Sequence, residues 1–467
     1  MKFSNIMTIT LVLLFSSCSF VPEYVKPKLP VPEKISTESN KYLDSKENPQ
    51  NISWDDFVKD EKLKKILKIG LENNKDIKIA ILNVEKLKAL YGIQRASLYP
   101  SLSTSADMIK KRTPEDLSKD GKVSHSEQYD VTLGISAWEI DFFGRLRSLK
   151  ESSLEEFLAM KESHKAVTIT IISEIARTYL NYAYAKSLYK LTEEILKSEQ
   201  EIHKIISKRF ELGLSPEIDL IQSRTRVESI KVELANIKNK ISLEENYLQL
   251  LTGNKVTKEL LPSDLEDIDT FKEFSPQLDS EILLGRPDIQ FAERKLKSAN
   301  ANIGAARSAF FPRITLTTNI GSASKELSGL FEAGSGSWLF MPQITMPIFD
   351  PRTWYAYDVA KAEKELAIAN YEKAIQIAFR EVADVIAVRE NIEYQLAVQT
   401  DIVNSYQRSL NISVDRYLKG IDSYLRVLEL QKSLLLAKQK LIDLKLLKLQ
   451  NAMNLYKSFG GGINSIN

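Results

Sequence analysis

The pattern of apolar and polar positions in residues 283–324 changes from the period of a helix to that of a strand. Apolar and small residues recur at helical spacing from residue 289 to residue 309, with charged residues on the other face. Pro312 then ends the helix. The next residues alternate, with Ile314, Leu316, Thr318 and Ile320 on one face and Thr315, Thr317, Asn319 and Gly321 on the other. We therefore expect a helix that leads through Phe310, Phe311 and Pro312 directly into a strand with one apolar face.

Three further segments show the same alternation, residues 129–138, 338–348 and, more weakly, 100–108. In the first of them Ala137 is expected on the apolar face and Trp138 on the polar face. Strands of about ten residues with one apolar and one polar face are typical of outer-membrane β-barrels, and single-chain bacterial barrels have at least about eight strands. Four strands therefore predict a barrel that several chains share. A half-buried soluble sandwich uses similar strands and remains an alternative at this point.

Two segments predict helices that are too long for a compact domain. Residues 145–212 contain no proline, and at about 1.5 Å per residue they would form a rod of about 100 Å. Residues 352–418 predict a second rod of similar length. Shorter helices are expected at residues 58–98 and 280–309, before the strands, and again after residues 215 and 423. The last helix carries two neighbouring apolar seams, which favours the wall of a helical tube over an ordinary bundle.

The chain repeats itself internally. The segment KRFELGLSPEIDLIQSR from Lys208 aligns with DRYLKGIDSYLRVLELQ from Asp415, which places Gly213 opposite Gly420. We therefore divide the chain into a first repeat (residues 58–260), a linker (261–279), a second repeat (280–457) and a tail (458–467). Each repeat is expected to contain a helix, two strands, a very long helix, a tight turn and a returning helix.

The N-terminus predicts export. Lys2 precedes an apolar run from residue 6 to residue 15, and small residues then lead to Cys18, the only cysteine. This arrangement resembles a bacterial lipoprotein signal, in which the cysteine becomes the lipidated N-terminus of the mature chain. Residues 1–17 are then a signal peptide and residues 18–57 an extended strap. An ordinary signal with a chance cysteine is the alternative.

Composition excludes several classes of function. The chain has 64 Lys and Arg against 62 Asp and Glu, and a net charge of +2 argues against nucleic acid as a partner. The three histidines are scattered without metal-site spacing, and LLTGNK from Leu250 lacks the first glycine of a phosphate loop. We therefore expect no enzyme activity, no cofactor and no metal site.

Several segments carry a resemblance to a known family. They are CSFVPEYVKP from Cys18, LLGRPDI from Leu283, ANANIGAARSAFFPRITL from Ala299, MPIFDPR from Met346, RYLKGIDSYLRVLELQ from Arg416 and LYKSFGGG from Leu455. Together they resemble the TolC-like outer-membrane efflux factors, in the lipoprotein branch that OprM represents. The resemblance implies an α+β membrane protein that forms a homotrimer, with a 12-stranded β-barrel continuous with a periplasmic α-helical barrel. It also implies a periplasmic adaptor, an RND-type inner-membrane transporter and a lipid anchor at Cys18 in the outer membrane.

The resemblance also assigns roles to the helical turns. The two tips, Gly213-Leu214-Ser215 and Gly420-Ile421-Asp422, would dock the adaptor, with Ser215 and Ser423 capping the returning helices. The positions that line the closed periplasmic aperture in the family are Leu425, Glu429 and Lys432, and Lys432 could bridge the converging carboxylates. Arg426 stands where TolC has the first of two acidic rings. Asp219 and Tyr417 correspond to links between neighbouring coils, although a solvated helix face or a local ion pair explains any of these residues equally well.

We expect the chain to be the outer-membrane exit duct of a tripartite efflux pump for small molecules, with an iris-like gate at its periplasmic end. Type I protein secretion and metal-ion efflux are alternatives, although seven methionines and three histidines form no cluster that would favour a soft metal. A purely structural lipoprotein that spans the periplasm is a further alternative, but it would not need the four alternating strands.

Overall fold

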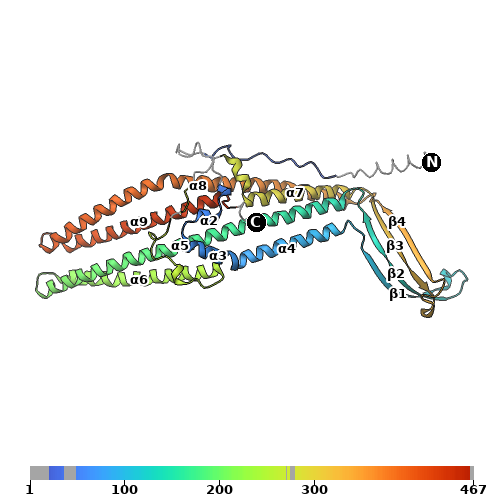
Figure 1. Ribbon diagram of the computed structural model, residues 1–467, viewed down its shortest axis with the longest axis horizontal. Helices are drawn as coiled ribbons and strands as arrows, with labels where there is room; N and C mark the ends of the chain where they lie inside the picture. Colours follow the sequence, from blue (N-terminus) through green and yellow to red (C-terminus); the bar gives the residue numbers. More distant parts are fainter. Residues whose placement is uncertain (1–19, 36–48, 270, 274–278, 463–467) are drawn as a thin grey trace. The chain divides into compact units, whose positions relative to one another are not determined.

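The computed structural model describes residues 20–35, 49–269, 271–273 and 279–462 (Figure 1). Cys18, the predicted signal peptide and the end of the predicted tail lie outside these residues. The helices and strands are α2 (Trp54–Phe57), α3 (Glu61–Asn73), α4 (Lys75–Ala96), β1 (Leu102–Thr113), β2 (Ser124–Ile140), α5 (Arg145–Glu211), α6 (Glu217–Thr252), α7 (Pro287–Ser308), β3 (Arg313–Ser324), β4 (Gly336–Thr345), α8 (Pro351–Leu418) and α9 (Tyr424–Ser458). The fold is mostly helical with one antiparallel sheet, and the predicted α+β class is confirmed.

The chain forms two compact units. The strand unit contains residues 83–160 and 291–371 together with the N-terminal segment up to Pro27. The hairpin unit contains residues 28–82, 161–290 and the chain from Glu372 onwards.

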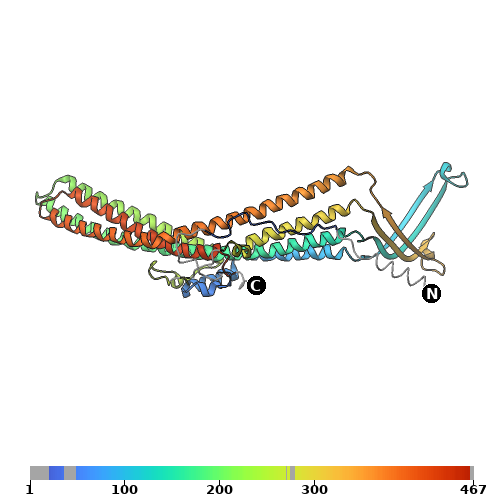
Figure 2. The same ribbon diagram turned by 90° about the horizontal axis from the view of Figure 1, so that it is seen from above.

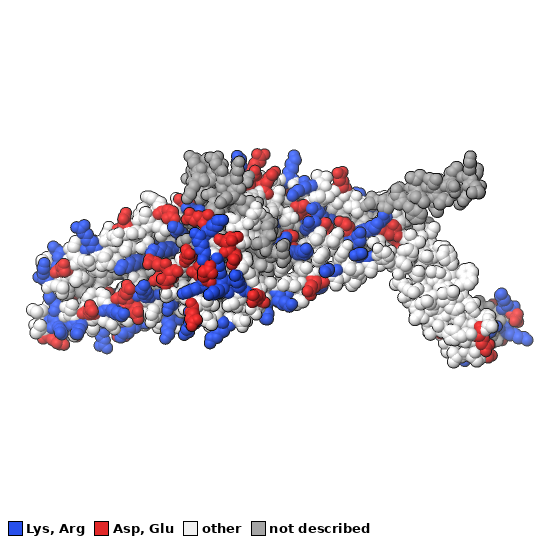
Figure 3. All heavy atoms as spheres, viewed as in Figure 1, with Lys and Arg blue, Asp and Glu red and all other residues white. Residues whose placement is uncertain are grey.

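The four strands form one sheet in the order β1-β2-β3-β4. Leu133 lies opposite both Thr104 and Ile320, and Ile320 lies opposite Trp338. Because residues that lie opposite each other point to the same side of a sheet, the apolar residues of the four strands share one face, as the alternation predicted. This apolar face is exposed, with Trp338 at 78% and Ile344 at 69% relative exposure. On the side shown in Figure 3, the strands are almost free of charged residues, in contrast to the helices.

A β-bulge in β2 overturns the face that we expected for Trp138. Ile135 pairs with Thr318 and Trp138 pairs with Leu316, so two residues of β2 between these pairs lie opposite one residue of β3. Ala137 takes up the extra residue with φ 48°, and its N–H donates to Thr317 Oγ1 at 3.1 Å. Trp138 therefore lies on the apolar face, and the prediction for Ala137 and Trp138 was wrong.

Other element boundaries also differ from the expectation. The predicted helix of residues 58–98 is broken at Asn74, whose Oδ1 accepts the N–H groups of Asp76 and Ile77 and so caps α4 as a new helix. β1 and β2 are longer than expected because their ladder continues to the pair Thr113 and Ser124. β4 is shorter and ends at Thr345, two residues before Pro347, which has no N–H to donate to a ladder.

The hairpin unit is built from two long antiparallel pairs of helices. α5 has 67 residues and returns through α6, and α8 has 68 residues and returns through α9. The two members of each pair lie side by side in both ribbon views (Figures 1 and 2). Near the turns, all four helices share an apolar cluster formed by Ile206, Tyr417, Tyr424 and Val427, with Leu220 packed against it.

Candidate functional site

The two predicted tips have the same backbone geometry. Gly213 has φ 69°, its N–H donates to Phe210 O, and the N–H of Leu214 donates to Arg209 O at 2.7 Å. This pair of bonds is a Schellman motif, in which the left-handed residue is almost always glycine. The second tip repeats it, with Gly420 at φ 73°, and with Gly420 N–H on Tyr417 O and Ile421 N–H on Arg416 O, both at 2.9 Å. The turns are therefore built by the same local chemistry in both halves of the chain.

The structure brings the two predicted inter-coil residues into one polar cluster within the chain. The Tyr417 hydroxyl donates to Asp219 Oδ2 at 3.3 Å, and the Ser215 hydroxyl donates to the same oxygen at 3.2 Å. The Arg209 guanidinium lies over the Tyr417 ring at 5.5 Å, and its Nη1 donates to Leu418 O. Burial raises the pKa of Tyr417. The first tip is thus tied to the end of α8 by neutral and charge-assisted contacts.

The capping role expected for Ser215 was wrong, and Ser423 stands at the N-cap of α9 as expected but without a side-chain bond. The N-cap position of α6 is Pro216, and the Ser423 side chain makes no capping hydrogen bond. Ser215 bonds Asp219 instead. At the second tip Asp422 accepts two hydrogen bonds from the Arg416 guanidinium, at 2.8 and 3.2 Å, and this pairing lowers the pKa of Asp422.

The predicted gate residues lie on the exposed side of α9. Tyr424, Val427, Gln431 and Leu434 form its buried side, whereas Leu425, Arg426, Glu429 and Lys432 are exposed. Glu429 Oε2 lies 3.9 Å from Arg426 Nη1, so Arg426 is a second candidate, beside Lys432, to neutralise this carboxylate. A cavity of about 390 Å³ is lined by both tips and by Leu425, so the predicted docking tips and the predicted gate are adjacent.

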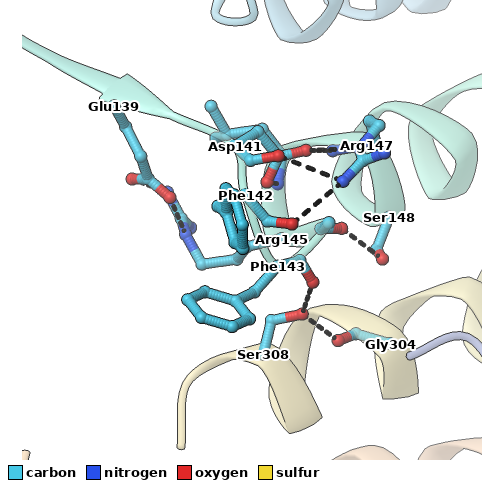
Figure 4. A network of polar contacts seen from close by, with 11 residues as sticks. Glu139, Asp141, Phe142, Phe143, Arg145, Arg147, Ser148, Gly304 and Ser308 are labelled. Atoms are coloured by element: carbon cyan, nitrogen blue, oxygen red, sulfur yellow. Dashed lines mark hydrogen bonds and ion pairs between the residues drawn. The ribbon is translucent and has the colours of Figure 1, made fainter. Parts of the chain in front are cut away.

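The predicted membrane border is a junction of aromatic rings and ion pairs. The Phe311 ring stacks on Phe20 at 4.4 Å and on Phe143 at 5.2 Å, and Phe310 meets Tyr357 edge to face. Pro312 immediately precedes β3, as expected. In Figure 4 the Ser308 hydroxyl reaches Phe143 O and Gly304 O, both at 2.8 Å, which ties the end of α7 to the turn before α5.

Sequence reasoning missed the charged residues that hold this junction. Glu139, which is 9% exposed, accepts two hydrogen bonds from the Arg145 guanidinium, at 2.8 and 2.7 Å. It also forms an ion pair with Arg313 at 2.6 Å. Asp141 accepts the N–H groups of Leu146 and Arg147 and so caps α5 (Figure 4). The signal available in the sequence was a pair of acidic residues followed within residues 139–147 by a pair of arginines, but only the fold shows which of them pair.

The motif LLGRPDI also has a structural explanation. Arg286 is 6% exposed and donates to Asp288 Oδ2 at 2.7 Å, to Glu381 Oε2 at 2.8 Å and to Ser458 O at 2.5 Å. It therefore joins the start of α7 to the middle of α8 and the end of α9. A Cβ on the preceding Gly285 would lie 2.2 Å from the Gln50 side chain, so any larger residue there would require Gln50 to move.

No group of three or more His, Cys, Asp or Glu among the described residues is arranged to hold a metal ion. No helix in this part of the chain is both long and apolar enough to cross a membrane.

Comparison with known proteins agrees with the resemblance. Residues 67–254 and 278–461 match the model of the outer membrane efflux protein family. The chain belongs to this family. It is 39% identical over 468 residues to the solvent efflux pump outer membrane protein SrpC of Pseudomonas putida, covering 99% of each chain. It is 35% identical over 452 residues to the cation efflux system protein CusC of Escherichia coli O157:H7, covering 96% of this chain and 97% of CusC. A solved membrane protein from Pseudomonas aeruginosa matches with a TM-score of 0.89 at 33% identity, covering 95% of this chain and 98% of that one.

Membership of the family confirms the predicted resemblance, the fold class and the function as an outer-membrane efflux channel. The relatives are named as components of efflux systems in the outer membrane, so the chain is a transport protein of that membrane. The roles of the tips, the gate, the inter-coil residues and Cys18 remain predictions.

Proposed function

We propose that this channel is the exit duct of a tripartite efflux pump, that it acts as a homotrimer, and that its four strands close with those of two further copies into one barrel. The observation that supports a barrel shared between copies is the sheet itself. Its apolar face is exposed, and β1 and β4 are edges with no further strand beside them in the described chain. Long open edges are a liability in a protein that stays monomeric. Pairing β4 of one copy with β1 of the next removes both edges.

We propose that the adaptor and an RND-type transporter of the inner membrane engage the duct at its two tips. The support is that Gly213 and Gly420 occupy identical turns, and that Leu214 at 63% and Ile421 at 59% exposure offer equivalent apolar contacts. The experiment is a pull-down of the complex from native membranes. We expect an adaptor and a transporter to be recovered with the native chain and lost when Leu214 and Ile421 are both changed to Glu.

We propose a lipid anchor at Cys18. Phe20, two residues further on, stacks on Phe311 at the predicted membrane border, and Asn300 Nδ2 donates to Pro22 O at 2.8 Å. The strap is therefore held at the border where an acyl chain on Cys18 would enter the membrane. Mass spectrometry of the mature N-terminus tests the acylation.

Small molecules are the proposed substrate class. The name of SrpC specifies solvents and the name of CusC specifies cations. Because the two relatives have similar identity to this chain, the comparison does not separate solvents from cations as its substrates. Sensitivity of a deletion strain to solvents, antibiotics and metal ions, restored by the cloned gene, separates these alternatives. Restored protein export would instead support type I secretion.

The gate is tested by conductance in planar bilayers. Changing Glu429 and Lys432 to Ala should raise single-channel conductance at least about fivefold, because charged contacts that hold the aperture are removed in every copy. The matched control is Glu228→Ala with Lys231→Ala, which removes an exposed pair at 2.9 Å from α6 instead. Equal conductance of the gate variant and the control would refute the gate.

A further inference from the structure

Glu199 on α5 is a deeply buried carboxylate in the hairpin unit. Its side chain is 2% exposed, and its recorded ion pair is with Arg226 on α6, where Oε1 and Nε are 3.7 Å apart. That separation is beyond the usual range of a strong charge-assisted hydrogen bond. The buried charge is therefore only partly compensated.

The surroundings of Glu199 contain an unusual number of unsatisfied polar atoms. Within the described chain, Glu199 Oε2, Arg226 Nη2, Gln431 Oε1 and Tyr424 OH are all buried without a hydrogen-bond partner. Buried polar groups are nearly always paired, and each exception costs about 1–3 kcal/mol. These four atoms come from α5, α6 and α9, so the uncompensated polar groups lie where the two hairpins pack together.

The position of this cluster connects it to the proposed gate. Gln431 stands on the buried side of α9 between Glu429 and Lys432, which occupy the exposed side. Gln431 and Glu199 both line a cavity of about 440 Å³ between α5, α8 and α9. A small separation of the hairpins would thus expose the carboxylate to water and shift the segment that carries the gate.

The charged and titratable groups around Glu199 do not offset the effect of its burial. Loss of hydration raises the pKa of Glu199, and this effect outweighs the opposing influence of the Arg226 charge and of the nearby polar side chain of Gln431. The groups that face the carboxyl or share its cavity are Arg226 from α6, Asp415 from α8, Tyr424 and Lys438 from α9, and Glu194 and Glu201 from α5 itself.

We propose that Glu199 is a positioning residue of the gate, which favours separation of the two hairpins while it is ionised and holds them together once it is protonated. The direction follows from linkage. A carboxyl that is harder to ionise in the packed state stabilises that state fully below its ordinary pKa, and this stabilisation is lost as the pH rises through the raised value. Acid therefore favours the packed arrangement. The inference rests on the proposed gate for its functional meaning.

The test compares full-length protein with Glu199→Gln, which is neutral at every pH and similar in shape. The matched control is Glu201→Gln, an exposed residue on the same helix that lines the same cavity. Hydrogen exchange of residues 424–438 is measured between pH 5 and pH 8, corrected for intrinsic exchange, with residues 444–456 of the same helix as the internal reference. We expect the native protein and Glu201→Gln to exchange faster as the pH rises, by about tenfold for each unit of pKa difference between the packed and the hydrated carboxyl. Glu199→Gln should exchange slowly at both ends of this range.

A second variant covers a failure to fold. Glu199→Gln leaves Arg226 without its counter-charge, so the double variant Glu199→Gln with Arg226→Gln, which has no buried charge, is prepared in parallel. It should show the same flat pH profile. His203, whose Nδ1 lies 2.7 Å from Ser223 Oγ, is unchanged in every variant, so a lost pH dependence belongs to Glu199.

Conductance separates this inference from the gate itself. If both hold, acidification lowers the conductance of the native channel and of Glu201→Gln but not that of Glu199→Gln. A changed exchange profile with unchanged conductance supports the role of Glu199 in the packing but overturns its coupling to the gate, and the gate itself stands or falls with the Glu429 and Lys432 variant. An exchange profile of Glu199→Gln that follows the native one overturns the role of Glu199 whatever the conductance shows.

Discussion

The substitution Arg286→Ala probes the contact that joins α7, α8 and the end of α9. The Arg286 side chain is 8% exposed, whereas the side chains of its two partners, Asp288 and Glu381, are 43% and 42% exposed. After the substitution water can hydrate both carboxylates, so their unpaired charges destabilise the folded state only slightly. The carbonyl of Ser458 loses its donor at 2.5 Å in a buried position, which costs about 1–3 kcal/mol.

The total follows from these contributions. Removing one member of a buried ion pair lowers the free energy of unfolding by about 3–5 kcal/mol. Because both carboxylate partners can be hydrated, we expect Arg286→Ala to lie near the lower end of this range, at about 3 kcal/mol. Arg286→Lys keeps the charge but cannot form the fork to Asp288 and reach Glu381 together, so it should recover only about half of the loss. Glu381→Gln keeps the shape of a half-exposed partner and should cost about 1 kcal/mol or less.

The assay is denaturant unfolding of the detergent-solubilised protein, followed by far-ultraviolet circular dichroism of the helices. We expect the free energy of unfolding to fall in the order native, Glu381→Gln, Arg286→Lys, Arg286→Ala. The double variant of Arg286→Ala with Glu381→Gln should be close to Arg286→Ala alone, because the shared contact can be lost only once. A loss below about 0.5 kcal/mol for Arg286→Ala would refute the structural role of this residue.

Two further predictions concern the tips and the sheet. Gly213→Ala should lower stability by about 1 kcal/mol because its φ of 69° is unfavourable for any other residue, whereas Gly92→Ala in α4 should raise it by about 0.5–1 kcal/mol. Neither added Cβ meets an atom within 4 Å, so equal effects of the two in a thermal unfolding assay would contradict the backbone argument. Phe340→Lys on the apolar face should make the free energy of assembly into liposomes less favourable by about 2–4 kcal/mol. Gln343→Lys on the other face should leave this free energy almost unchanged. Similar assembly of both lysine variants would count against a lipid-facing sheet.

The sequence alone determined the features that depend on neighbouring residues. The alternation in residues 314–321 identified the apolar face of β3, and the glycines at 213 and 420 identified two left-handed turns that the structure contains. The long proline-free segments predicted α5 and α8 almost to their ends. In each case the period or the allowed backbone conformation is written in a few consecutive residues.

The tertiary structure decided the features that depend on contacts between distant residues. The bulge at Ala137 exists because β2 must keep register with β3, and it moved Trp138 to the other face. The partners of Arg286 and Glu199 lie on other helices, and whether a buried charge is paired or strained depends on distances that no local pattern encodes. Periodicity determines which way a side chain points from its own element, but only packing determines what it meets there.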